Sequence, residues 1–176
     1  MFQVNDIVKY GTTGVCKIID ISFKNISGHS RQYFVLKPVH QESMTIYVPK
    51  DNSALLSKMQ TILSAREIES LIDDMPSCGV QWIDNDKIRQ ESFKKIISSG
   101  NRKDLIGLVR TLYLRQEKLR QSNKKLHLVD ARMMQEAEKL ITDEFATVLH
   151  IETEEVVPFI VEKIKRKEAE ASVFYQ

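Results

Sequence analysis

Short apolar runs alternate with turn-forming residues over the first sixty positions, a pattern that is typical of β-strands joined by tight turns. Apolar and β-branched positions predict strands over residues 2–10, 15–21, 32–37 and 44–48. The glycines of Gly11-Thr12-Thr13-Gly14 favour a turn, residues 25–29 form a polar hairpin tip, and Pro38 and Pro49 end the last two strands. The pattern predicts a small, strongly bent sheet or SH3-like barrel.

Beyond residue 63 the apolar positions recur at helical spacing. Ser64-Ala-Arg-Glu67 has the pattern of a capping box, and Pro76 ends the helix that follows it. Gly100 is predicted to be a left-handed C-terminal cap, Asn101 to cap the next helix, and Thr153 to begin the last one. The apolar faces expected to be buried are Ile68, Leu71, Ile72 and Met75; Ile88, Phe93, Ile96 and Ile97; Leu105, Leu108, Val109 and Leu112; Met133, Met134, Ala137, Leu140, Ile141, Phe145 and Val148; and Val157, Ile160, Val161 and Ile164.

The chain therefore reads as an α+β protein of two modules, with an N-terminal β-barrel followed by an all-α domain. We predict a barrel over residues 1–62, a connecting helix and break over 63–79, and a helical domain over 80–176.

Positive charge is concentrated in one part of the chain. Residues 87–125 carry 12 basic and 3 acidic side chains, net +9, whereas residues 1–86 have a net charge of −2 and residues 126–176 of −5. Apolar residues at helical spacing interrupt the basic block, so it belongs to a folded surface that attracts polyanions, chiefly nucleic acid. The alternative is a solvated helical face whose charges only maintain solubility.

Trp82, the single tryptophan, lies just after the break and within five residues of the first basic side chains. A lone tryptophan in a helical domain is commonly a core anchor. Its position at a break and its polar neighbours Asp84, Asn85 and Asp86 favour a second possibility. Minor-groove proteins combine phosphate-binding cations with a bulky apolar side chain that presses against a base step.

No constellation for catalysis stands out. The four histidines have no metal-ligand spacing, and no glycine-rich phosphate loop or nucleophile motif is present, so we expect no enzyme, cofactor or metal. Cys16 and Cys78 form no metal or redox spacing. No apolar run approaches the roughly 18 residues that span a bilayer, and the first residues lack signal-peptide features. We expect a cytoplasmic monomer that does not contact membranes.

The N-terminal module resembles the CarD-like bacterial transcription regulators, whose barrel also occurs in the transcription-repair coupling factor. The resemblance rests on residues 2–10, Thr13-Gly14-Val15, residues 33–37 and residues 44–49. It implies a Tudor-like barrel that binds the β subunit of RNA polymerase by edge-strand pairing. The family usually has glycine where Asn5 stands, and some members have arginine in place of Tyr47. The implied polymerase contacts are Lys24, Thr45, Ile46, Tyr47 and Val48.

The resemblance continues to about residue 150 through Trp82, Arg89, Phe93, Ser99-Gly100, residues 105–112, Arg132-Met-Met and residues 137–140. In that family the tryptophan wedges into the minor groove at the upstream edge of the promoter bubble and slows its collapse. The resemblance implies an open-complex stabiliser that associates with the nucleoid through the polymerase and binds promoter DNA without sequence preference. Together with the basic block, it predicts DNA contacts from Trp82, Lys87, Arg89, Lys94, Lys95, Lys103 and Arg110.

The leading alternative is a protein adaptor on the polymerase, in which the helical half recruits a second protein and Trp82 belongs to the core. RNA binding by the barrel is disfavoured because the first half of the chain has a net negative charge.

Overall fold

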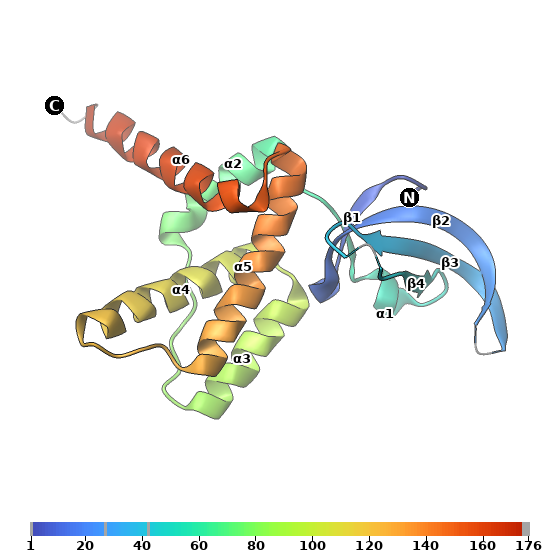
Figure 1. Cartoon of the computed structure of the whole chain (residues 1–176), viewed down its shortest axis with the longest axis horizontal. Helices are drawn as coiled ribbons and strands as arrows, with labels where there is room; N and C mark the ends of the chain where they lie inside the picture. The colour runs from blue at the N-terminus through green and yellow to red at the C-terminus, as the bar shows by residue number, and fades with distance from the viewer. Residues whose placement is uncertain (1, 27, 42, 174–176) are drawn as a thin grey trace. The chain divides into compact units, whose positions relative to one another are not determined.

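The computed structural model describes residues 2–26, 28–41 and 43–173, with side chains except those of His29 and residues 168–173. Its contacts divide the chain into two compact units, residues 1–62 and residues 63–176 (Figure 1). The first unit is a β-sheet and the second is helical, so the predicted α+β class is confirmed.

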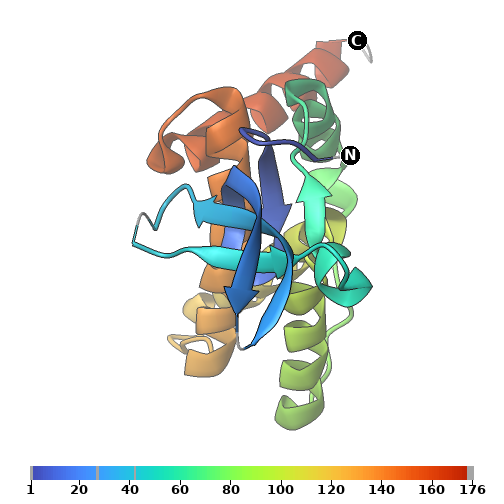
Figure 2. The same cartoon turned by 90° about the vertical axis from the view of Figure 1, so that its right-hand side faces the viewer.

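Five strands form one antiparallel sheet in the order β4-β3-β2-β1-β5. Figures 1 and 2 show that β2 and β3, the two longest strands, bend strongly along their length. Residues 25–29 were predicted as a polar hairpin tip, yet Asn25 pairs with Ser30 and Ile26 with His29, because cross-strand pairing extends the ladder beyond the apolar residues. Ser27, in the predicted hairpin tip, lies outside the described residues. The strands are β1 (Ile7–Tyr10), β2 (Gly14–Ile26), β3 (His29–Pro38), β4 (Ile46–Pro49) and β5 (Met59–Thr61).

Two short elements were not predicted, α1 (Ser53–Leu56) and β5. Both are too brief to display a hydrophobic period, and β5 exists because its three residues pair with β1. The core of this unit contains Val8, Cys16, Ile18, Phe34, Leu36 and Val48.

Backbone torsion accounts for two features of the first unit. Gly11 (φ 47°) and Gly14 (φ 84°) bracket a single turn of 3₁₀ helix, η1 (Gly11–Thr13), in place of a simple turn. Asn5 also has a positive φ, 77°, and its N–H donates to the carbonyl of Ile18 at 2.8 Å. Asparagine tolerates this left-handed region better than most residues, so it can stand where glycine is usual in the resembling family.

Several helices of the second unit begin or end where local sequence signals predict. The side-chain oxygen of Ser64 accepts from the Glu67 N–H while Glu67 accepts from the Ser64 N–H, which completes the capping box. Gly100 ends α3 with φ 65°, and Asn101 caps α4. The elements are α2 (Ala65–Asp74), the 3₁₀ turn η2 (Met75–Ser77), α3 (Asp86–Ser99), α4 (Arg102–Gln121), α5 (Leu128–Leu149) and α6 (Thr153–Val173).

These helices share one apolar core, and α5 packs against α2, α3, α4 and α6 (Figures 1 and 2). The helix that we predicted as a connector, α2, contributes Ile68, Leu71 and Ile72 to this core. Near the start of the unit, the buried carboxylate of Glu144 accepts from Arg102 Nη2 at 2.6 Å and from the Leu63 N–H at 3.1 Å. Charged hydrogen bonds thus fasten the first residues of the unit to α4 and α5.

Two of the predicted apolar faces are partly wrong. Ile88 is exposed on α3, and Val157 and Val161 are exposed on α6, where Val156 is buried instead. The last helix has more apolar positions than one face can hold, so packing against α2 and α5 selects the buried side. Among the described residues, no helix has the length and apolarity needed to cross a bilayer.

Candidate nucleic-acid interface and partner-binding strand

Trp82 lies in the irregular segment between η2 and α3 and is half-buried against the helical core. Its ring meets Phe93 edge-on at a centroid distance of 6.5 Å. Its indole Nε1 donates to Asp84 Oδ1 at 3.1 Å. The tryptophan therefore has a packed side and a solvent-facing side, so a core role and a contact role are compatible.

The chain that leads to Trp82 is held closely against α4. The N–H of Val80 donates to the hydroxyl of Thr111 at 2.9 Å, and that hydroxyl donates to the Val80 carbonyl at 3.3 Å. A Cβ atom added to Gly107 would lie 3.2 Å from backbone atoms of Gly79, a contact so tight that the two segments would have to move apart by a few tenths of an ångström. These contacts limit the freedom of the segment immediately before Trp82.

Arg89 is buried, with 3% of its surface exposed, and its guanidinium lies 4.4 Å from the centre of the Trp82 ring. Nη1 donates to the carbonyls of Ile83 and Asp84 at 2.8 and 3.2 Å, and Nη2 donates to Asp86 and Asp130 at 2.7 and 2.8 Å. Burial lowers the pKa of Arg89, but the hydrogen bonds and charges of the two carboxylates outweigh it and raise the pKa above its ordinary value. Arg89 therefore supports Trp82 from inside the fold, and we remove it from the expected phosphate contacts.

Arg115 is a second cation beside the same indole, and the sequence did not single it out. Its guanidinium lies 4.8 Å from the centre of the Trp82 ring, and its side chain is exposed on α4. Thirty-three residues separate the two positions, so no local spacing could relate them.

The other basic residues predicted to bind DNA fall into two groups. Lys87, Lys94 and Lys95 are exposed on α3. Lys103 Nζ donates to Asp74 Oδ2 at 2.8 Å, and this hydrogen bond raises the pKa of Lys103. Arg110 Nη1 donates to the Cys78 carbonyl at 3.0 Å. Among the described residues the first group has no such partner, whereas Lys103 bonds to the end of α2 and Arg110 to the residue after η2, although the Lys103 side chain is 64% exposed.

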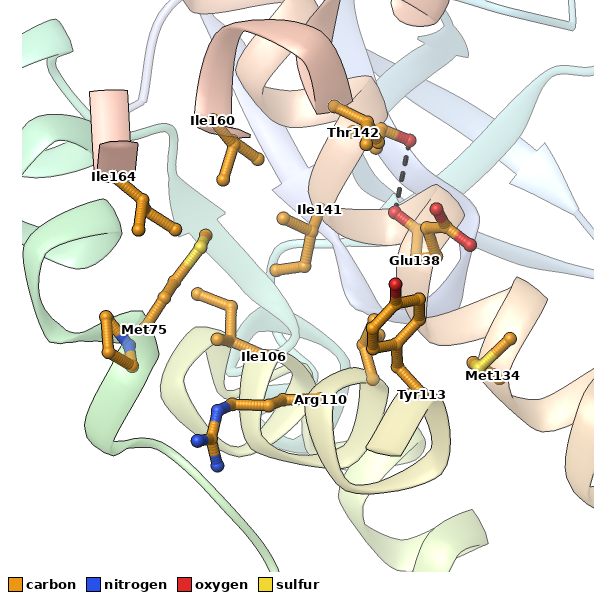
Figure 3. Close-up of a pocket in the computed structure, with 13 residues that line it drawn as sticks. Met75, Ile106, Arg110, Tyr113, Met134, Glu138, Ile141, Thr142, Ile160 and Ile164 are labelled. Atoms are coloured by element: carbon orange, nitrogen blue, oxygen red, sulfur yellow. Dashed lines mark hydrogen bonds between the residues drawn. The ribbon is translucent and has the colours of Figure 1, made fainter. Parts of the chain in front are cut away.

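Arg110 also borders a cavity of about 460 Å³ between η2, α4, α5 and α6 (Figure 3). Met75, Ile106, Ile141 and Ile160 supply apolar walls, and the hydroxyl of Thr142 donates to the Glu138 carbonyl within them. Trp82 and Arg115 do not line this cavity. Positions 110 and 115 point about 140° apart around the helix axis, so α4 separates the cavity from the tryptophan.

In the first unit, β4 is an edge strand of the sheet, paired only with β3 in the strand order. The Lys50 N–H donates to the Gln32 carbonyl at 2.9 Å, and antiparallel ladders alternate, so Val48 and Ile46 also direct their backbone groups to β3. The backbone N–H and C=O of Tyr47 consequently point outward, away from β3, and Thr45 lies just before the strand begins. The Tyr47 side chain is 45% exposed and contacts Tyr33 edge-on.

The remaining residues predicted at this surface have different environments. Val48 is buried in the sheet core, and Ile46 is half-buried against it. Lys24 lies on β2 opposite Arg31, two residues beyond the last β3–β4 pair, and is 3.7 Å from Asp20. Of the five predicted residues, Tyr47 combines an outward backbone with an exposed side chain, and Thr45 is exposed just before β4.

Models of known protein families match residues in both units. The family model described as the CarD-like/TRCF RID domain matches residues 2–60, and the model described as the CarD C-terminal domain matches residues 79–170. The chain belongs to the CarD-like family. The resemblance found in the sequence is thereby confirmed. A search of curated proteins finds no match.

Membership of the CarD-like family identifies the chain as a transcription factor that interacts with RNA polymerase, in a family of non-enzymatic proteins. The two matches leave residues 61–78 between them, which include α2 and its capping box. In this CarD-like protein the sequence could not reveal the surroundings of Trp82. Arg115 contacts the ring from α4, and Asp130 on α5 binds the Arg89 that lies against it.

Proposed function

We propose that this CarD-like transcription factor docks on the RNA polymerase β subunit through strand β4 and stabilises the promoter open complex through Trp82. In this proposal, Trp82 enters the minor groove at the upstream edge of the bubble. The observation that carries it is the setting of the indole, which packs against Arg89 and Phe93 and keeps a solvent-facing side beside the exposed cation Arg115.

The outward backbone of Tyr47 supports the docking step. An edge strand with unpaired N–H and C=O groups can accept a strand from a partner, and the backbone then supplies the hydrogen bonds. Pairing of this kind does not require an arginine at position 47. Thr45 and Tyr47 would form the hydrogen bonds, Ile46 and Val48 would hold β4 on the sheet, and Lys24 would contribute charge beyond its end.

The exposed lysines of α3 support the DNA step. Lys87 and Lys94 are seven residues apart and therefore lie on one side of the helix, with Lys95 adjacent. Contacts to phosphate position a protein without reading sequence, and docking on the polymerase supplies a high local concentration, so the helical unit need not bind DNA tightly alone. Lys103 and Arg110 would join this set only by exchanging their present partners, Asp74 and Cys78, for phosphate.

Stabilisation of the open complex follows from differential binding. A wedge that contacts only the open state shifts the equilibrium by its affinity for that state, and no catalysis is needed. Aromatic stacking on a base contributes about 1–3 kcal/mol, which corresponds to a change of roughly tenfold or more in the open-complex population. We propose that the protein acts in the cytoplasm and reaches the nucleoid through the polymerase.

A second candidate function is a protein adaptor on the polymerase, in which Trp82 acts only as part of the core. The packing of the indole against Phe93 favours this alternative. The adaptor would hold the polymerase through the same edge strand but leave the lifetime of the open complex unchanged.

The decisive experiment measures open-complex lifetime with RNA polymerase from the same organism, comparing wild type with Trp82→Ala. Tyr113→Ala is a matched control because it truncates another aromatic residue of the helical unit, one that is 55% exposed. We expect wild type and the Tyr113 variant to prolong the lifetime and the Trp82 variant to lose most of the effect. A melting curve verifies that each variant is folded.

If folded Trp82→Ala prolongs the lifetime as wild type does, the wedge is refuted. If none of the proteins changes the lifetime while all still bind polymerase, the adaptor replaces the proposal.

A further inference from the structure

Two guanidiniums lie against the Trp82 ring, and they differ in burial and in hydrogen bonding. Arg89 is buried and donates to four acceptors, two of which are carboxylates. Arg115 is exposed and, within the part of the chain that the structure describes, forms no hydrogen bond or ion pair besides its contact with the ring. Arg89 is therefore held by the fold, whereas Arg115 can bind an external anion.

The local charge balance distinguishes them further. Asp86 and Asp130 both pair with Arg89, whereas Asp84 accepts from Trp82 Nε1 and is not paired with Arg115. Arg115 thus has no carboxylate within ion-pair distance among the described residues. An anion brought to this side would meet Arg115 first, because Arg89 is covered by protein.

We propose that Arg115 is a positioning residue that covers the Trp82 ring in the free protein and moves onto a DNA phosphate when Trp82 enters the groove. This inference rests on the proposed function and adds a residue to it. Arginine suits both positions because its planar guanidinium stacks on aromatic faces and also binds phosphate through two parallel hydrogen bonds. The exchange would uncover the ring for a base step while anchoring the backbone beside it.

The first test uses the intrinsic fluorescence of the free full-length protein, since Trp82 is the only tryptophan in the chain. Arg115→Gln should raise the quenching of this fluorescence by acrylamide, a neutral quencher, because the ring loses its cover. Arg120→Gln is the matched control. It removes an exposed guanidinium from the same helix, and that guanidinium lies 3.9 Å from Glu117 and makes no contact with the indole. Equal quenching in wild type and Arg115→Gln would overturn the covering role.

The second test asks whether Arg115 reaches phosphate. The affinity of the protein for a polymerase–promoter complex is measured at several salt concentrations for wild type, Arg115→Gln, Arg115→Lys and Arg120→Gln. Loss of one phosphate contact lowers the slope of log affinity against log salt by about 0.7–0.9. We expect this decrease for Arg115→Gln, little change for Arg120→Gln, and a slope close to wild type for Arg115→Lys, which keeps the charge.

The outcomes separate this inference from the function it rests on. If Arg115→Gln exposes the ring but leaves the salt slope unchanged, Arg115 is only structural and the exchange is refuted. If Arg115→Gln and Arg120→Gln lower the slope equally, the effect is general charge and the exchange is also refuted. If Trp82→Ala has no effect on open-complex lifetime, the proposed function itself fails, whatever the Arg115 variants do.

Discussion

Arg89 and Asp130 form a buried ion pair, with Nη2 and Oδ2 2.8 Å apart, and the same guanidinium lies against the Trp82 ring. Both side chains are almost completely inaccessible to solvent. The pair joins the start of α3 to the start of α5, 41 residues apart in the chain. The orientation of the proposed wedge thus depends on a contact between two distant helices.

We expect Asp130→Asn to destabilise the protein by about 3 kcal/mol, because the buried charge of Arg89 loses its buried carboxylate partner. Asp86→Asn is the control. Asp86 also binds Arg89 but its side chain is 65% exposed, so its loss should cost less than about 1 kcal/mol. Urea unfolding at neutral pH measures both variants, and equal costs would contradict the importance of the buried pair.

A double variant, Arg89→Met with Asp130→Leu, tests the same pair by replacing both partners. Arg89 Nε and Asp130 Oδ1 have no hydrogen-bond partner among the described residues, so the pair is imperfectly satisfied. We therefore expect the double variant to recover at least half of the stability lost in Asp130→Asn. Its Trp82 fluorescence should still differ from wild type because the cation beside the ring is gone. A double variant less stable than Asp130→Asn would be inconsistent with this account.

Gly107→Ala should destabilise the helical unit by about 1–2 kcal/mol, since overpacking against the Gly79 backbone outweighs the helix propensity that alanine adds. The same substitution should shift the Trp82 fluorescence, because α4 must move away from the segment that holds the indole. Gly79→Ala is the control, as its Cβ would meet Thr111 at an ordinary 3.6 Å. Thermal unfolding and emission spectra measure both, and a neutral Gly107→Ala would show that α4 adjusts freely.

Tyr47→Pro should weaken polymerase binding at least tenfold, because it removes an outward N–H of β4 and places a ring where a partner strand would pair. Tyr47→Ala removes the exposed side chain and keeps the backbone donor, so its effect should be several times smaller. The sheet should remain folded in both, since this N–H does not bond to β3. Binding of each folded variant to purified polymerase decides the point, and a larger loss for Tyr47→Ala would favour side-chain recognition.

The capping box of α2 predicts a pH dependence. The backbone N–H of Ser64, followed by its hydroxyl, lowers the pKa of Glu67 below its ordinary value of 4.5. A carboxyl group whose pKa is lower in the folded than in the unfolded chain stabilises the fold at pH values above its unfolded pKa. This stabilisation disappears as the pH falls through the folded pKa. Glu67→Gln should therefore be less stable than wild type at pH 7, and the difference should shrink below pH 4.5.

Ser64→Ala supplies the comparison for that experiment. It should cost about 1 kcal/mol at neutral pH through loss of the cap. Melting temperatures from pH 3 to pH 7 measure both variants. A difference between Glu67→Gln and wild type that stays constant across this range would contradict the assigned hydrogen bonds.

Local signals in the sequence determined most of the fold. Ser64, Gly100 and Asn101 mark helix ends because their side chains or backbone torsions satisfy terminal groups within a few residues. Short strands and turns likewise indicated the sheet, except where β5 is too brief for a period. Composition located the basic block, and the order of motifs indicated the family that the comparisons confirm.

Only the tertiary structure decided the surroundings of each candidate site residue. Lys87 and Arg89 are two positions apart and share a charge, yet one is exposed and the other is buried against Asp130, because α5 covers one side of α3. Arg115 reaches Trp82 because α4 and the segment after η2 are held together through Gly79 and Thr111. Sequence periodicity tells which residues share a face of one helix. What that face contacts depends on packing between segments distant in the chain. This packing buries the guanidinium of Arg89 and leaves that of Arg115 exposed.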